Sequence, residues 1–144
     1  MSGGRIVHGS RDGVQLLCYQ GEIRYPTAAA VDACIALLLG QQGLKGFVVD
    51  LTAVEMIDST HLGILARLAK AMRQAGLPPV TLVSNRPAVD ELLEGMGFHQ
   101  VFHIVPESGV ELERMREIPP AVRDPAGMRR LLLETHQALM EMNP

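Results

Sequence analysis

The chain has 144 residues and a formal net charge of −3; 47% of its residues are hydrophobic, 3% are aromatic and none is tryptophan. This length suits one domain with its own core, and no apolar run reaches the roughly 18 residues of a membrane-spanning helix. Scattered basic residues and scarce aromatic rings argue against a nucleic-acid-binding surface. We therefore expect a globular protein that binds neither a membrane nor nucleic acid directly.

The N-terminus and the cysteines bear on the cellular compartment. Residues 1–8 lack the apolar core of a signal peptide. Cys18 and Cys34 lie in apolar segments without a CxxC spacing, which favours reduced core thiols over a disulfide. We expect a cytoplasmic protein.

Hydrophobic periodicity, together with the positions of glycine and proline, divides most of the chain into alternating strands and helices. The expected strands are residues 5–7, 14–20, 46–51, 80–83 and 101–105, and the expected helices are residues 28–39, 59–75 and 87–97. Because strands and helices alternate, we expect an α/β domain in which the helices pack against the sheet.

Residues 109–144 extend this domain, which spans residues 1–108. A charged connector over residues 106–123, which contains three prolines and in which we expect a helical turn at 110–116, leads to Asp124 and Pro125, a typical helix start. Apolar positions then recur at helical spacing, at Met128, Leu131, Leu132, Thr135, Ala138, Leu139 and Met142. This amphipathic helix over residues 124–142 must be covered, either by its own domain or by a partner, such as a second copy in a homodimer.

The segment around Asp58 and Ser59 is the most informative. After the apolar strand and a short loop, these two residues open a helix, where unpaired N–H groups and the helix dipole favour negative charge. Two interpretations follow: the residues only cap the helix, or Ser59 accepts a phosphate.

Three segments carry a resemblance to a known family. The most specific is Asp50-Leu51 with Ile57-Asp58-Ser59-Thr60 and Leu62-Gly63; the others are Gly21-Glu22-Ile23 with Thr27-Ala28, and Pro87-Ala88-Val89 with Leu92-Leu93 and Gly97-Phe98. In order and spacing they resemble the STAS domain family of bacterial anti-sigma factor antagonists. The resemblance covers residues 5–108 and implies a mixed sheet of four or five strands backed by helices, to which the C-terminal helix is an addition.

The resemblance also implies a regulatory protein that is not an enzyme and needs no cofactor. Ser59 would be phosphorylated by a partner that is both serine kinase and anti-sigma factor, and a PP2C-like phosphatase would reverse this. Phosphorylation would end partner binding and so control sigma-dependent transcription. Thr60 is the second choice of acceptor. The partner-binding surface implied by the resemblance consists of Glu22, Arg24, Thr27, Asp58, Ser59, Thr60, His61 and Gly63.

The chain departs from the family pattern at two positions. His61 stands where the family usually has glycine, and Arg24 stands where an acidic residue is usual. We expect His61 to be exposed at the start of its helix, so that it shapes partner choice. Arg24 either neutralises a phosphate on Ser59 or is a solvated surface side chain.

Other functions have weaker support. No nucleophile, base and acid converge in a pattern that marks an enzyme. His99 and His103 lie ~13 Å apart if both belong to the expected strand, too far to bind one metal ion. A second candidate function is a non-phosphorylated STAS subunit that binds the ATPase of a membrane transport complex.

Overall fold

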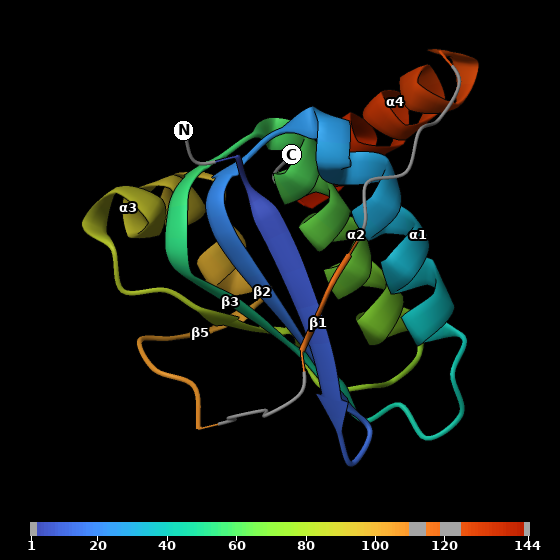
Figure 1. Ribbon diagram of the computed structural model, residues 1–144, viewed down its shortest axis with the longest axis vertical. Helices are drawn as coiled ribbons and strands as arrows, with labels where there is room; N and C mark the ends of the chain where they lie inside the picture. The colour runs from blue at the N-terminus through green and yellow to red at the C-terminus, as the bar shows by residue number, and fades with distance from the viewer. Residues whose placement is uncertain (1–2, 110–114, 119–124, 143–144) are drawn as a thin grey trace.

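The computed structural model describes residues 3–109, 115–118 and 125–142. Its centre is a six-stranded sheet with the order β5-β4-β3-β2-β1-β6 (Figure 1). The strands are β1 Arg5–Arg11, β2 Val14–Ile23, β3 Gly46–Ile57, β4 Thr81–Val83, β5 His103–Val105 and β6 Arg116–Glu117. β1 is antiparallel to β2 and β6, whereas β2, β3, β4 and β5 are parallel to one another. The predicted mixed sheet is thus confirmed, with β6 added from the connector.

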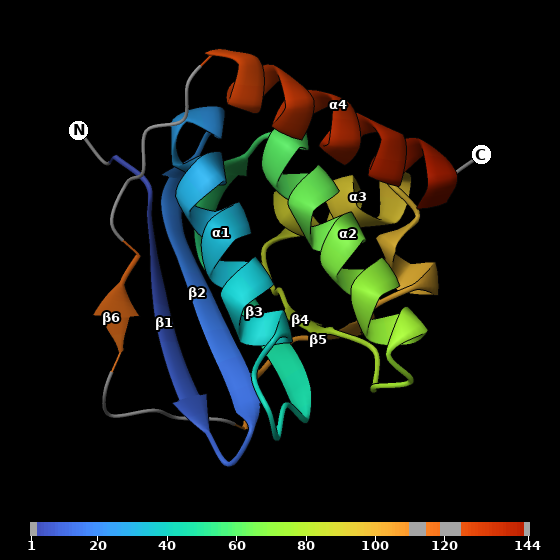
Figure 2. The same cartoon turned by 90° about the vertical axis from the view of Figure 1, so that its right-hand side faces the viewer.

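In the described part of the chain, four α-helices accompany the sheet: α1 Ala28–Leu39, α2 Ser59–Gln74, α3 Pro87–Gly95 and α4 Pro125–Met142. Two short 3-10 helices, η1 Tyr25–Thr27 and η2 Phe98–Gln100, precede α1 and β5. Figure 2 shows α1 and α2 side by side in front of the sheet, with α4 lying across them. The core between these layers is mainly aliphatic, and its fully buried members include Leu17, Leu51, Leu65, Leu68, Met72 and Leu82.

β3 is longer than the sequence predicts. The prediction of a loop after Leu51 is wrong. β3 continues to Ile57, because β2 also continues to Ile23 and provides hydrogen-bonding partners. Two register shifts, between Cys18 and Gln20 and between Gly21 and Glu22, accommodate the extra residues. As a result, Asp58 follows the last residue of β3 directly.

α4 packs against α2 of the same chain, which is one of the two alternatives that its apolar stripe left open. Leu131 and Thr135 are fully buried. Two ion pairs border the contact: Arg67 Nη1 lies 3.3 Å from Glu134 Oε2, and Lys70 Nζ lies 2.7 Å from Glu141 Oε2. Self-association through α4 remains a prediction.

Several expectations for the connector and the C-terminal strands need correction. Arg116, expected in a helical turn, lies in β6; residues 110–114 of that turn and the expected cap Asp124 are outside the described residues. His99 belongs to η2 and not to a strand, since β5 begins only at His103.

The cysteines are half-buried free thiols. Burial, followed by the charge of Asp50, raises the pKa of Cys18 to about 11, and burial also raises the pKa of Cys34. Both thiols are therefore protonated at neutral pH, the poorly reactive form.

Within residues 3–109, 115–118 and 125–142, no helix has both the length and the apolar character needed to cross a membrane. The same residues contain no group of three or more His, Cys, Asp or Glu side chains that could hold a metal ion.

Candidate phosphorylation and partner-binding site

The start of α2 is capped by Asp58 and not by Ser59. The Asp58 backbone is extended, with φ −88° and ψ 169°, and its Oδ1 accepts a hydrogen bond of 3.0 Å from the backbone N–H of His61. This is the geometry of an N-cap aspartate. Ser59 is the first residue of the helix, and its side chain is exposed. The capping interpretation therefore applies to Asp58 and leaves the Ser59 hydroxyl accessible.

The next residue, Thr60, differs sharply in accessibility. Its side chain faces the core side of the helix start, and only 4% of the residue is exposed. A kinase must bring the acceptor oxygen into contact with the γ-phosphate of its nucleotide, which requires an accessible hydroxyl. Burial thus favours Ser59 over Thr60 as the acceptor.

His61 is fully buried, so the expectation that it is exposed is wrong. Its Nε2 donates a 2.9 Å hydrogen bond to the carbonyl oxygen of Arg24 and lies 3.0 Å from Oγ1 of Thr27. A carbonyl oxygen can only accept, so Nε2 carries the proton. Burial lowers the pKa of His61, although the Arg24 hydrogen bond and the charge of Asp58 oppose this. His61 is therefore neutral at pH 7 and joins α2 to the loop before α1.

The sequence could not predict this burial, because the apolar stripe of α2 does not include His61. In the folded chain, residues 60 to 66 are all buried, since the core contacts one side of the helix and α4 covers another. The Tyr19 and His61 rings pack in a T-shaped arrangement, with an interplanar angle of 82° and centroids 6.2 Å apart.

The segment from Glu22 to Thr27 lies beside the start of α2. The backbone N–H of Asp58 donates to the carbonyl oxygen of Ile23 at 3.0 Å, and Thr27 Oγ1 donates to that of Arg24, also at 3.0 Å. The Arg24 guanidinium pairs with the Glu22 carboxylate at 3.2 Å, and both side chains are largely solvent-accessible. These hydrogen bonds, with the one from His61 to Arg24, hold the segment that carries Glu22, Arg24 and Thr27 against the start of α2.

Gly63, which the resemblance places on the partner-binding surface, packs against α4 of its own chain. It is buried, and a Cβ atom at this position would lie only 2.5 Å from the carbonyl oxygen of Thr135 in α4. Glycine thus allows α4 to approach α2 closely. Because Thr60, His61 and Gly63 are buried, we do not propose them as direct partner contacts.

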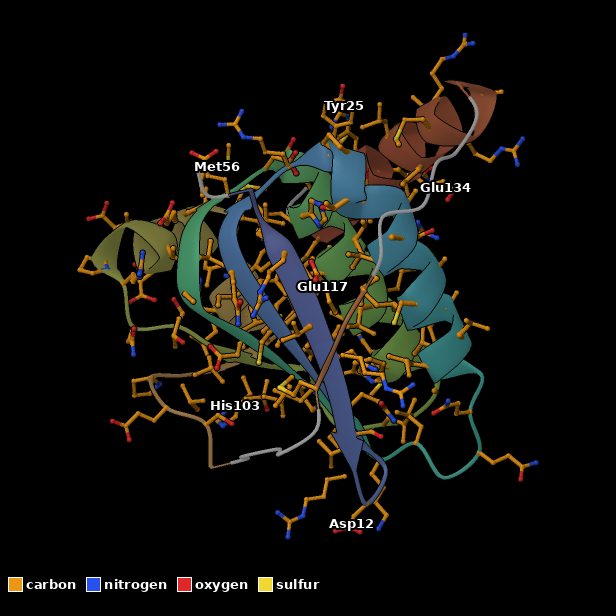
Figure 3. The ribbon with its side chains drawn as sticks, in the orientation of Figure 1. Asp12, Tyr25, Met56, His103, Glu117 and Glu134 are labelled. Carbon is orange, nitrogen blue, oxygen red and sulfur yellow. The ribbon has the colours of Figure 1, made fainter. Side chains whose placement is uncertain are left out.

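Three further residues at this end of the sheet were not identified from the sequence. Tyr25 is 54% exposed, and Figure 3 places it with Met56 at the end of the molecule opposite Asp12. Arg86 reaches across from the start of α3, where its Nη1 donates to the carbonyl oxygen of Val54 at 3.1 Å. The longer β3 explains why Met56 and Arg86 were missed, since it brings Met56 and the Arg86 partner Val54 to the same end of the sheet as Ser59.

Comparisons with solved structures give the same fold. An anti-sigma factor antagonist from Mycobacterium paratuberculosis is 26% identical, with a TM-score of 0.60 over 73% of this chain and 87% of that one. Unphosphorylated SpoIIAA, also an anti-sigma factor antagonist, has a TM-score of 0.61 at 10% identity, covering 72% and 89% of the two chains. The phosphorylated form of SpoIIAA, a Bacillus cell fate determinant, has a TM-score of 0.59 at 12% identity, covering 72% and 92%.

The comparison with curated proteins finds no match. The model of the STAS domain, however, matches residues 6–110, which include the whole β2–α1 loop, the start of α2 and the sheet from β1 to β5. The matched range contains the three segments that carry the resemblance, and it ends before α4. The chain belongs to the STAS domain family.

Proposed function

We propose that this protein is an anti-sigma factor antagonist whose binding to an anti-sigma factor with serine kinase activity is switched off by phosphorylation of Ser59. One observation carries this proposal: Ser59 is exposed at the first position of α2, while Asp58 provides the cap and Thr60 is buried. The names of the solved relatives support the general role, and one of them is described as a phosphorylated form.

The physical basis of the switch is a change of local charge. Phosphorylation would add about −1.5 to −2 charges at neutral pH to a surface that already carries Asp58. A partner surface shaped for a neutral hydroxyl would then meet uncompensated negative charge, which can cost several kcal/mol of binding free energy. A loss of this size is enough to dissociate a complex of moderate affinity.

In this proposal the protein acts by binding and performs no catalysis. The kinase partner supplies the nucleotide and Mg²⁺, and a separate PP2C-like phosphatase removes the phosphate. The contacts that we assign to the partner are the exposed or half-exposed members of the site, Glu22, Arg24, Thr27, Asp58 and Ser59, with Tyr25 added.

Phosphosite mapping tests the proposal directly. The full chain is incubated with its cognate kinase and ATP, and the modified residue is located by mass spectrometry. We expect one phosphate, on Ser59, and none on the Ser59→Ala variant. Ser10→Ala is the matched control, because Ser10 is also exposed but lies in β1; this variant should be phosphorylated like the wild type.

Other results would point elsewhere. Modification of Thr60 alone would mean that the helix start opens before phosphorylation and that Ser59 is the wrong acceptor. Absence of phosphorylation on either residue, combined with stable binding to a transport ATPase, would favour the non-phosphorylated STAS subunit.

A further inference from the structure

We propose that Arg24 is an internal receptor for the phosphoryl group: when Ser59 is phosphorylated, the Arg24 guanidinium leaves Glu22 and pairs with the phosphate. The inference rests on the proposed function, because it assigns a role within the same switch. It follows from three features of the structure: the hydrogen bonds that hold the Arg24 backbone, the exposed ion pair of its side chain with Glu22, and the other charged residues near Ser59.

Two hydrogen bonds hold the backbone of this segment against the first turn of α2. The carbonyl oxygen of Arg24 accepts from His61 Nε2 at 2.9 Å, and His61 is two residues after Ser59. One residue earlier, the carbonyl oxygen of Ile23 accepts from the backbone N–H of Asp58, the neighbour of Ser59, at 3.0 Å. The backbone at Arg24 is thus fixed beside Ser59 by the buried His61 side chain and by the Asp58 backbone, while the Arg24 side chain stays in solvent.

The present partner of Arg24 is easily exchanged. Its Nη2 lies 3.2 Å from Glu22 Oε2, and the two side chains are 57% and 44% exposed. Exposed ion pairs of this kind contribute little to stability. A phosphate monoester carries nearly two charges and three acceptor oxygens, and it matches the planar fork of a guanidinium in a bidentate arrangement. The phosphate should therefore displace the single carboxylate charge of Glu22.

The exchange would change the surface at two places. Arg24, a cation available to a partner in the unphosphorylated protein, would be occupied by the phosphate. Glu22, at the end of β2, would lose its cation and present an uncompensated carboxylate. Phosphorylation would then remove a positive charge from the partner-facing surface as well as adding negative charge.

Arg86 is the other cation to consider at this end of the sheet. Its guanidinium already donates to the carbonyl oxygen of Val54 in β3, whereas Arg24 belongs to the segment that is hydrogen-bonded to Asp58 and His61. The acidic groups near Ser59 along the chain are Asp58, which follows β3, and Glu55, which lies within β3 near its end. A test of the proposal must therefore separate Arg24 from Arg86.

The experiment uses the full chain with phosphoserine encoded genetically at position 59, so that it requires no kinase. The second pKa of the phosphate, near 6 for a free phosphoserine, is measured by ³¹P NMR titration. A guanidinium in contact stabilises the dianion, so Arg24→Gln should raise this pKa by at least about half a unit. Arg11→Gln is the matched control: it removes the same charge from an exposed arginine that pairs with Asp12, in the hairpin at the opposite end of the molecule.

We expect the phosphate pKa to be unchanged in Arg11→Gln and little changed in Arg86→Gln. Glu22→Gln should lower it, because the competing carboxylate is gone. An Arg24→Gln value equal to that of the control, or a larger rise in Arg86→Gln, would overturn the proposal. Because phosphoserine is built in, these outcomes are independent of phosphosite mapping with the kinase, which tests the proposed function itself.

Discussion

His61 illustrates how one side chain can join two parts of the site. Its imidazole, buried between β2 and α2, holds the carbonyl oxygen of Arg24 while its own backbone N–H is held by Asp58. The loop that carries Arg24 and the helix that carries Ser59 are therefore fixed relative to each other through one residue. A glycine at this position, as is usual in the family, would provide no such side-chain link.

Replacing His61 by alanine should destabilise the fold by about 2–4 kcal/mol, because it leaves a cavity and removes the hydrogen bond to the Arg24 carbonyl oxygen. The free energy of unfolding, measured with urea, checks this. His99→Ala is the control: His99 is exposed, so its loss should change stability by less than about 0.5 kcal/mol. Equal stability of both variants would mean that His61 is not held as described.

The lowered pKa of His61 predicts a dependence of stability on pH. Burial is the main cause of the lowering, so the unfolded chain, in which the pKa is about 6.5, binds the proton more readily than the folded chain. The stability that neutral His61 contributes above about pH 6.5 should therefore be lost as the pH falls through the folded-state pKa of His61.

The comparison of wild type with His61→Gln isolates this contribution, since glutamine keeps a donor but does not titrate. Unfolding free energies are measured at about pH 7.5 and about pH 5.5, on either side of the unfolded pKa. The wild type should lose more stability than the variant on acidification. The same loss in both would show that other groups cause it.

Among the elements, helices were predicted more accurately than strands. The periodic apolar residues of α1 and α2 and the prolines at their boundaries are local signals. The extension of β3 over Thr52–Ile57 depends on pairing with the distant end of β2, and β6 has only Arg116 and Glu117, both exposed. β6 contains no apolar residue, and the apolar residues Val54, Met56 and Ile57 do not by themselves distinguish a strand from a loop, so pairing with a neighbouring strand decided both.

The contact between α2 and α4 makes a further prediction. A methyl group at position 63 would clash with the backbone of Thr135, which cannot move aside as a flexible side chain can. Gly63→Ala should therefore push α4 away and cost about 1–3 kcal/mol of stability. The free energy of unfolding is the measurement, and binding of a hydrophobic dye reports exposure of the apolar face around Leu131.

Gly95→Ala is the matched control, because Gly95 is also helical but has open space where its Cβ would lie. Alanine there should be neutral or stabilise by up to about 1 kcal/mol. If both variants behave alike, α4 does not depend on the close approach at Gly63.

At the scale of the whole molecule, the proposed function is concentrated at one end. Tyr25 and Met56 lie there, and the β1–β2 hairpin with Asp12 lies at the other (Figure 3). The net charge of −3 is modest, and ions in the cell screen charges over about 8 Å. A phosphate on Ser59 should therefore act on a partner that touches this end and have little effect elsewhere on the surface.

The central claim is that the charge state of Ser59 controls partner binding. The affinity of the anti-sigma factor for the full chain is measured twice, once with serine and once with encoded phosphoserine at position 59, by calorimetry at physiological salt. We predict at least about tenfold weaker binding of the phosphorylated chain, a difference of about 1.4 kcal/mol or more. Equal affinity of the two forms would contradict the account.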